Sequence, residues 1–310
     1  MKITIPETLK GDLPLTLWGK ILGATPIVMT VVATMLAGLA SSEMTRAQYD
    51  RSWAAQMQSK AGDQWSFFQA KRLRGALQRN TLDLMHSTTE VRALSREALR
   101  AALAGTPAAA ALESGGGRQA LGALLEGELP KPAATRPIAA EVQAALHALE
   151  VSRPDGELVA LLGQVDDATL AAELRHAQDQ ALAFDAATKP INQIVDTIER
   201  AVTAPGAEAG LRREFIATRL NYAALRYDAE ARLNQVIGSL YELQVRKGNL
   251  SAERHHRRSQ KFFYGMLAAQ LGVIVATLAM AARKRNLLWS LAAAAGAAAI
   301  SFAAYVYLYV

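Results

Sequence analysis

The chain has 310 residues and a formal net charge of +6, and 51% of its residues are apolar although only 6% are aromatic. The absence of cysteine excludes disulfides, thiol catalysis and cysteine-ligated metals together. The positive charge does not indicate a nucleic-acid partner, because no nucleic-acid-binding motif accompanies it and many basic residues flank apolar segments, where cations meet lipid headgroups.

The first 40 residues predict a polar N-terminal head over residues 1–17 and a transmembrane helix over residues 18–40. Ile21 to Ala40 carries no charge, and 20 residues at helical rise cross a hydrocarbon layer of roughly 30 Å. A cleaved signal peptide is the alternative, because small residues precede Ser41, but its apolar region would be too long. We therefore expect an uncleaved anchor that is kinked at Pro26.

A charged, helix-favouring segment follows, and we predict an outgoing stalk helix over residues 41–103. Apolar or small residues recur three or four positions apart, or at multiples of these spacings, so they lie along one side of a helix. This stripe comprises Trp53, Met57, Ala61, Leu73, Leu77, Asn80, Leu84, Val91, Leu94 and Ala98. We expect it to pack on a second helix.

Residues 104–207 are predicted to form a loop and a small helical cap. The glycine triplet Gly115–Gly117 and several prolines indicate the loop. Asp166 or Asp167 is suited to cap one helix, and Pro190 to begin the next. The helix after Pro190 carries a sharp apolar stripe of Ile191, Ile194, Val195, Ile198 and Val202.

A return stalk helix is predicted over residues 208–261 and a transmembrane hairpin over residues 262–310. The hairpin consists of an apolar run from Phe262 to Ala282, the basic turn Arg283–Arg285, and a second uncharged run to the end. The two long helices have similar lengths and opposite directions. The predicted fold class is therefore all-α, with three transmembrane helices, a long antiparallel helical-hairpin stalk resembling a coiled coil, and a small helical cap.

Small residues at four-residue spacing mark candidate packing faces of the spans, namely Gly19, Gly23, Ala268, Gly272 and Ala276. Packing of the three helices within one chain and oligomerisation both explain this pattern. Gln270 is a strongly polar residue well inside a span. It is suited to hydrogen-bond between helices, or to line a pore.

The segment Asp63-Gln64-Trp65-Ser66-Phe67-Phe68-Gln69-Ala70-Lys71 resembles the D-Q-W-x-x-Y-Q-A-K signature of an uncharacterised bacterial membrane-protein family, domain of unknown function 4337. The tail resembles the same family through His255-His256-Arg257, Ala269-Gln270-Leu271-Gly272 and Leu288-Trp289. Phe68 replaces the usual tyrosine, and the middle of the chain is longer than in the family. The resemblance implies a bacterial inner-membrane protein and brings no established activity.

Two interpretations of this segment remain open. In the first, a docking surface for a partner is formed by Asp63, Gln64, Trp65, Phe68, Gln69 and Lys71. In the second, the aromatic residues pack on Tyr222, Tyr227 or Leu233 of the return helix, and the polar groups fix the register. Large aromatic side chains usually bury area, which favours the second.

The sequence contains no catalytic motif, so we expect no enzyme and no cofactor. Asp83 with His86, and Glu173 with His176, have the spacing found in carboxylate-bridged metal bundles. Such a site needs two more inward carboxylates, and nothing in the sequence singles them out. Ordinary surface pairs explain both better.

The leading hypothesis for function is a non-catalytic membrane scaffold or accessory subunit, which forms a homo-oligomer or joins a larger membrane complex and contacts membrane lipids but no nucleic acid. The alternatives are an oligomeric channel or transport component and a metal-binding helical bundle. Basic residues in the head and in the hairpin turn predict that both are cytoplasmic and that the stalk is periplasmic, in a bacterial inner membrane.

Overall fold

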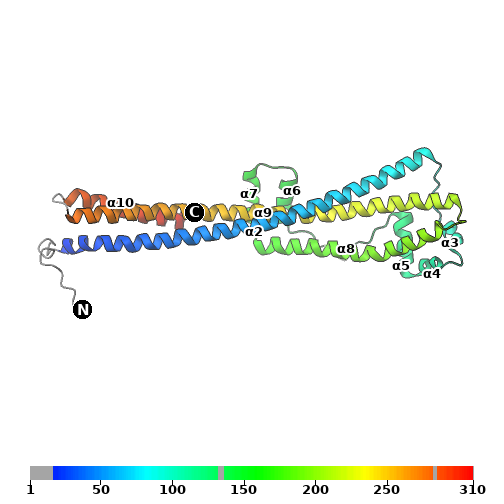
Figure 1. Ribbon diagram of the computed structural model, residues 1–310, viewed down its shortest axis with the longest axis horizontal. Coiled ribbons are helices and arrows are strands. Elements are labelled where there is room, and N and C mark those ends of the chain that lie inside the picture. Colours follow the sequence, from blue (N-terminus) through cyan, green and yellow to red (C-terminus); the bar gives the residue numbers. More distant parts are fainter. Residues whose placement is uncertain (1–16, 132–135, 282–284, 310) are drawn as a thin grey trace. The chain divides into compact units, whose positions relative to one another are not determined.

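The computed structural model describes residues 17–131, 136–281 and 285–309, and these parts contain helices and no strand (Figure 1). The predicted all-α class is confirmed. The predicted head, residues 1–17, lies outside the described residues except for Leu17. The helices are α2 (Leu17–Thr88), α3 (Arg96–Leu103), α4 (Pro107–Glu113), α5 (Gly115–Leu121), the π-helical turn η1 (Gly122–Glu126), α6 (Ala140–Glu150), α7 (Asp155–Gln164), α8 (Asp167–Val202), α9 (Ala209–Ala281) and α10 (Arg285–Tyr309).

Three of these helices, α2, α9 and α10, contain segments long and apolar enough to cross a membrane. Large apolar side chains on these segments point away from the protein, among them Ile27 and Met35 on α2 and Leu271 and Ile274 on α9. Contiguous exposed apolar surface on this scale is matched by lipid rather than by water. The chain is therefore a membrane protein with three candidate spans.

The chain divides into two compact units, which we describe separately. Unit 1 comprises residues 1–54 and 246–310, and unit 2 comprises residues 55–245.

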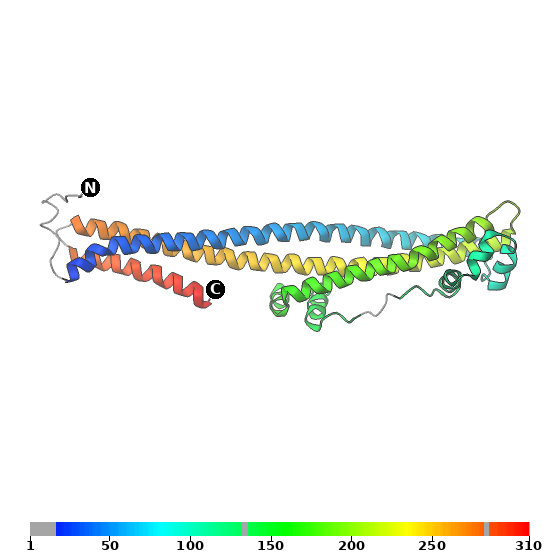
Figure 2. The same cartoon turned by 90° about the horizontal axis from the view of Figure 1, so that it is seen from below.

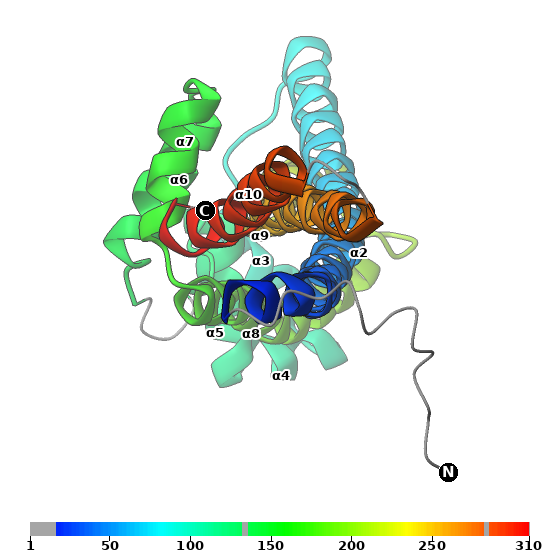
Figure 3. The ribbon, with the colours of Figure 1, turned by 90° about the vertical axis from the view of Figure 1, so that its left-hand side faces the viewer.

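In unit 1, the α9 and α10 segments pack on α2 through one apolar cluster. The cluster contains Met29, Ala33, Leu36 and Ala40 from α2, Phe262 and Ala269 from α9, and Ala299 and Val306 from α10. Figure 3 shows α10 lying against α9. Ser259 donates a hydrogen bond to the carbonyl oxygen of Ala40 at 2.8 Å, and Gly265 lies against Leu36. Ala40 of α2 meets Ser259 of α9, whereas Leu36, earlier on α2, meets Gly265, later on α9. The two helices are therefore antiparallel in this unit.

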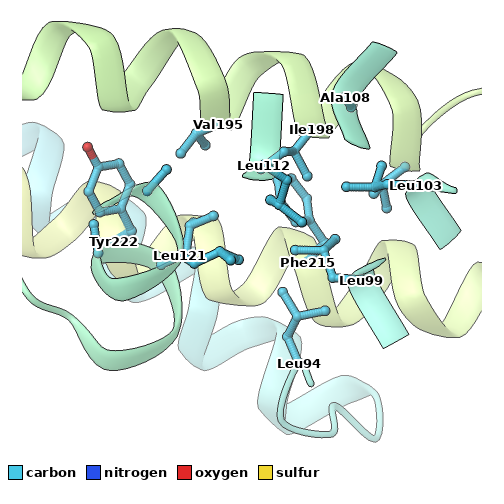
Figure 4. Packing of buried hydrophobic residues seen from close by; sticks show 14 of the residues in the cluster. Leu94, Leu99, Leu103, Ala108, Leu112, Leu121, Val195, Ile198, Phe215 and Tyr222 are labelled. Atoms are coloured by element: carbon cyan, nitrogen blue, oxygen red, sulfur yellow. The ribbon is translucent and has the colours of Figure 1, made fainter. Parts of the chain in front are cut away.

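In unit 2, the core lies where α3, α4 and α5 pack against α8 and α9. Figure 4 shows Phe215 and Tyr222 of α9 facing Val195 and Ile198 of α8, with leucines of the short helices between them. In Figure 2, α8 lies alongside the part of α9 that belongs to this unit. The predicted stripe on α8 therefore buries its apolar residues as expected, with Ile191, Val195, Ile198 and Val202 all buried. Asp166 caps α8 as predicted, because its carboxylate accepts hydrogen bonds from the amides of Ala168 and Thr169.

The first long helix ends at Thr88, not at Leu103 as the sequence indicated. Three consecutive hydroxyl residues lie at this point, and the side chains of Ser87 and Thr88 both bond to the carbonyl oxygen of Leu84. Such side chains compete with the backbone and weaken the helix. Ser95 then caps α3 by accepting a hydrogen bond from the amide of Ala98 at 3.0 Å.

Two other predicted interruptions are helical. Pro190 lies inside α8 and does not begin a new helix. The missing amide of one proline costs less than separating the buried stripe on either side of it. The glycine triplet was predicted to be loop, but Gly115–Gly117 forms the first turn of α5, which Ser114 caps through the Gly117 amide.

The predicted stripe on α2 is buried only in its first part. Met57 and Ala61 are buried, whereas Leu73, Leu77 and Leu84 are 63%, 54% and 61% exposed. Gly75, which packs against Asp228 and Tyr227 of α9, marks the side of α2 that faces α9. Leu73 is two residues away and therefore lies on the opposite side.

Candidate functional site

The signature segment Asp63–Lys71 lies on α2 in unit 2 and packs in part on α9. The Trp65 indole N–H donates a hydrogen bond to Glu242 at 2.8 Å, and its ring lies over Gly238. The predicted contact with the return helix is thus observed, but its partners are Gly238 and Glu242, not the expected tyrosines or leucine. Glycine at 238 leaves room for the broad indole ring.

The polar residues of the segment divide between two environments. Gln64 and Phe68 are partly buried, and the Phe68 ring meets Trp65 edge-on with ring centroids 5.4 Å apart. Lys71 forms an ion pair with Glu230 and lies 5.6 Å from the centre of the Tyr227 ring. Asp63 and Gln69 are exposed. The segment therefore fixes the register of α2 on α9, and Asp63 and Gln69 lie on its exposed side.

About two helical turns beyond Lys71 on α2, charged and aromatic groups from α2, α8 and α9 surround a cavity of about 240 Å³. Arg79 pairs with Asp228, and Arg226 lies 3.5 Å from Glu230 while stacking on the Tyr227 ring at 4.6 Å. The cavity is lined by Gln78, Asn192, Val195, Asp196, Arg219, Tyr222, Ala223, Arg226 and Tyr227. The Arg79–Asp228 ion pair joins α2 to α9 at this polar junction, and an ion pair between Arg219 and Glu199 joins α9 to α8.

Tyr222 is the buried titratable group of this junction. Its hydroxyl donates to Asn192 Oδ1 at 2.7 Å, and only 3% of the residue is exposed. Burial raises the pKa of Tyr222 to about 12, with Arg226 lowering it and Glu230 and Asp196 raising it. The hydroxyl therefore stays protonated at neutral pH and acts as a donor.

We expect Tyr222→Phe to change how stability depends on alkaline pH. The folded pKa is raised above the ordinary value of 10.0, so the stabilisation is present below pH 10 and is lost as pH rises towards 12. In the parent protein this loss is roughly 2–3 kcal/mol, and in the variant that part of the slope disappears. At neutral pH the variant loses about 1 kcal/mol with its hydrogen bond. Urea unfolding in mild detergent at neutral pH and between pH 9 and 12 gives the free energy of unfolding of the two proteins. The same change of this free energy with pH in both proteins would contradict the expectation.

In unit 1, a histidine joins the two long helices. His255 Nδ1 of α9 lies 2.5 Å from Glu43 and its Nε2 lies 4.0 Å from Asp50, both on α2. Glu43 is 9% exposed and also approaches Arg46 at 3.7 Å. His255 thus lies between the two helices, because it shares a face of α9 with Ser259 and Phe262, which also contact α2.

Three of the candidate packing residues of the spans, Ala268, Gly272 and Ala276, are buried or partly buried within unit 1. A Cβ atom at Gly272 would lie 2.6 Å from Met29 of α2 and 3.3 Å from Ala295 of α10, so glycine permits this approach. Ala276 is fully buried and Ala268 is partly buried against the same cluster. Gly23 is partly buried, and the surroundings of Gly19 lie outside the described residues. Gln270 differs, because it is exposed on the outer side of α9 in the middle of the apolar segment.

Neither pair with metal-bundle spacing gathers further ligands. Glu173 is 2% exposed and pairs with Arg136 at 2.6 Å, while His176 contacts Gln180. Asp83 and His86 are exposed. Among the described residues, no group of three or more histidine, aspartate or glutamate side chains is arranged to hold a metal ion.

Sequence reasoning missed the partners of the signature segment and the polar junction around Tyr222. The signal for the junction was the alternation of arginine, tyrosine and acidic residues between Arg219 and Glu230 on one helix. The sequence alone does not give the residues that these groups contact, because they lie on other helices.

Comparison with known proteins gives one relationship. No curated protein and no solved structure matches the chain. Residues 18–114 match a family described as a domain of unknown function (DUF4337), and this match contains the whole signature segment but not the tail motifs. Residues 18–114, which contain the first span and the tryptophan that packs on α9, are thus similar to the DUF4337 domain.

Proposed function

We propose that the protein is a non-catalytic membrane scaffold or accessory subunit that assembles through a second copy of itself. One observation carries this proposal: in the part of the chain that the structure describes, an apolar face of α2 in unit 2 has no partner. We call it the leucine face; it consists of Leu73, Leu77, Asn80 and Leu84.

The leucine face has the composition of a coiled-coil seam. Its members are spaced four, three and four residues apart, which is the spacing of alternating core positions in a heptad repeat. Leu73, Leu77 and Leu84 are each more than half exposed, although charged residues surround them along the helix. Figure 1 shows that α2 diverges from α9 towards Thr88, so no other described helix covers this face.

A second copy of the chain is the occupant that this pattern fits. Two identical helices bring the same heptad spacing and place Asn80 against the seam of the partner. A single asparagine in such a seam selects register and oligomeric state at some cost in stability. Burial of three leucines on each helix supplies several kcal/mol for association.

Cysteine crosslinking tests the assembly directly, because the chain has no native cysteine. We expect Leu77→Cys to give disulfide-linked dimers under mild oxidation in native membranes, since Leu77 lies near the middle of the face. Phe67→Cys is the matched control: Phe67 is 55% exposed on the same helix but lies off the leucine face. Equal crosslinking at both positions, or none at Leu77→Cys, would contradict the proposal.

Substitution of the face measures its strength. We expect the triple change Leu73→Glu, Leu77→Glu and Leu84→Glu to weaken self-association by more than about 100-fold, because three buried leucines are lost and like charges oppose each other. Phe67→Glu should change it by less than about threefold. Particle mass in mild detergent is the measurement, and a parent protein that runs at the mass of one chain would sink the proposal.

A channel or transport component is the second candidate, and Gln270 favours it. An exposed amide at mid-span has no water to bond, so in an oligomer it either pairs across subunits or lines a pore. Flux through reconstituted liposomes that is lost in Gln270→Leu supports the pore. Retained assembly without flux supports the scaffold.

We infer a bacterial inner membrane with unit 2 in the periplasm. The support is the basic content of the head and of the turn near Arg285, which the positive-inside rule places in the cytoplasm. Labelling of Gln164→Cys by an impermeant maleimide in intact cells gives the orientation.

A further inference from the structure

A row of cations lies on α9 immediately before its apolar segment, in unit 1. Arg254, Arg258 and Lys261 are four and three residues apart, so they share one face of the helix. Among the described residues none of the three forms an ion pair, whereas the neighbouring Arg257 pairs with Glu253 at 2.9 Å. The row is therefore an uncompensated concentration of positive charge.

Further towards the C-terminus of α9, the same face packs against α10. Gly265 lies against Ala299 and Phe302 of α10, and Gly272 lies against Ala295 and Ala292. The Lys261 ammonium lies 5.7 Å from the centre of the Tyr305 ring, one turn before α10 ends at Tyr309. On the N-terminal side of Lys261, the described part of α10 no longer covers this face, and Arg254 is exposed. The row thus begins where the last span ends.

The groups around the row belong to a membrane interface. Tyr305 and Tyr309 stack with their ring centroids 5.5 Å apart, and both rings are substantially exposed. Exposed tyrosines at the end of a span are typical of the headgroup level. The side chains of Tyr264 and Leu267 then continue the exposed surface as an apolar one, suited to acyl chains. A ligand at the row therefore has its polar part beside arginine and its apolar part beside the spans.

One donor in the row is left without an acceptor. The Nε atom of Arg258 is buried and has no hydrogen-bond partner in the described part of the chain. A buried donor without an acceptor costs about 1–3 kcal/mol. Arg258 is only partly buried as a residue, so a turn of its flexible side chain presents Nε to a phosphate oxygen, and guanidinium groups bind phosphate through two parallel N–H donors.

We propose that Arg254, Arg258 and Lys261 bind the phosphate of an anionic phospholipid headgroup, in the leaflet at the Phe262 end of the α9 span. The charge of the row matches the headgroup, and the span and tyrosines bring the lipid to it. This site is independent of the leucine face and adds a lipid-specific contact to the proposed assembly.

Lipid retention measured on the full-length protein tests the site. The protein is placed in nanodiscs or detergent with phosphatidylglycerol or phosphatidylcholine, and the retained lipids are counted by native mass spectrometry. We expect the parent protein to prefer phosphatidylglycerol by about tenfold or more, since each basic group near the surface contributes about 1 kcal/mol. The triple change Arg254→Gln, Arg258→Gln and Lys261→Gln should abolish the preference.

A matched control removes the same charge elsewhere on the helix. The triple change Arg212→Gln, Arg213→Gln and Arg232→Gln, all on the part of α9 in unit 2, should leave the preference within about twofold of the parent value. Arg258→Lys should give an intermediate preference, because it keeps the charge but loses the Nε donor. Circular dichroism establishes that each variant is folded before its lipids are counted.

Three outcomes would overturn the site. The first is an equal affinity of the parent protein for both lipids. The second is a preference that the Arg254, Arg258 and Lys261 changes leave intact. The third is full displacement of the lipid by millimolar inorganic phosphate, which would show an ion site rather than a lipid site. Because particle mass reports the leucine face separately, failure here does not depend on failure of the assembly.

Discussion

Phe215→Ala is expected to destabilise unit 2 by about 4 kcal/mol, the larger of the two strongest effects that the structure predicts. Phe215 is fully buried in the core cluster, where α9 faces α8 across the leucines of α3, α4 and α5 (Figure 4). Truncation removes the transfer free energy of the ring and leaves a cavity. The ring lies between α8 and α9, which are long continuous helices, so the surroundings collapse into that space only in part.

Thermal unfolding of the full-length protein in mild detergent, followed by circular dichroism, measures the effect. For a unit of this size the melting temperature should fall by roughly 8–16 °C, which corresponds to 2–4 °C for each kcal/mol. Phe67→Ala is the control, since it removes the same ring from an exposed position on α2 and should shift the transition by less than about 2 °C. Similar shifts for both variants would mean that the cluster around Phe215 is not the core of the unit.

The fold class and the membrane spans were predictable from the sequence because they depend on local properties. An uncharged run of the right length indicates a span wherever it lies in the chain. The α8 stripe was similarly clear, because Ile191, Val195 and Ile198 have a single apolar side to bury. Asp166 caps its helix through its own carboxylate, which requires no information about distant residues.

Helix ends were predicted less well, because local preference competes with packing there. Pro190 is a strong sequence signal for a helix start, yet the buried stripe around it keeps α8 continuous. After Thr88, by contrast, local preference prevails over packing. Hydroxyl side chains end α2 where it has little buried contact to lose, although the sequence there has no proline or glycine.

The side of a helix that packs on its neighbours was the feature predicted least well. Spacing alone placed Leu73 and Leu77 on the same stripe as Met57 and Ala61, but the structure turns the leucines outward. A step of four residues advances about 40° beyond a full turn of an α-helix, so the steps in multiples of four from Ala61 to Leu77 carry the stripe round to the opposite side. The contact of Gly75 with Asp228 and Tyr227 fixes which side faces α9, and that contact joins residues far apart in the sequence.

The candidate site was predicted in part for the same reason. The aromatic character of Trp65 predicted burial on the return helix, which the structure shows. Its actual partners, Gly238 and Glu242, carry no sequence signal that pairs them with tryptophan. The exposed Gln270 is similar: its polarity in an apolar span was evident, but whether it faces inward or outward depended on which helices pack on α9.

Gly117→Ala is expected to destabilise unit 2 by about 3 kcal/mol, although it adds a single methyl group to a helix. A Cβ atom at Gly117 would lie less than 3.0 Å from the carbonyl oxygens of Ala111 and Leu112. These are backbone atoms at the end of α4, so they cannot move aside as a flexible side chain would. The Ser114 cap of α5 also bonds to the Gly117 amide at 3.0 Å, and a shift of the backbone would strain that bond.

Gly62→Ala is the matched comparison, because Gly62 is exposed in the interior of α2 and a Cβ atom there would meet nothing within 4 Å. Alanine favours helix over glycine by up to about 1 kcal/mol, so this change should raise the melting temperature. The two substitutions are chemically identical and are expected to act in opposite directions. The same thermal unfolding measurement distinguishes them. A stabilised Gly117→Ala protein would show that α4 and α5 do not meet at Ser114 as the structure has them, and with that the docking of the short helices on Phe215 would have to be redrawn.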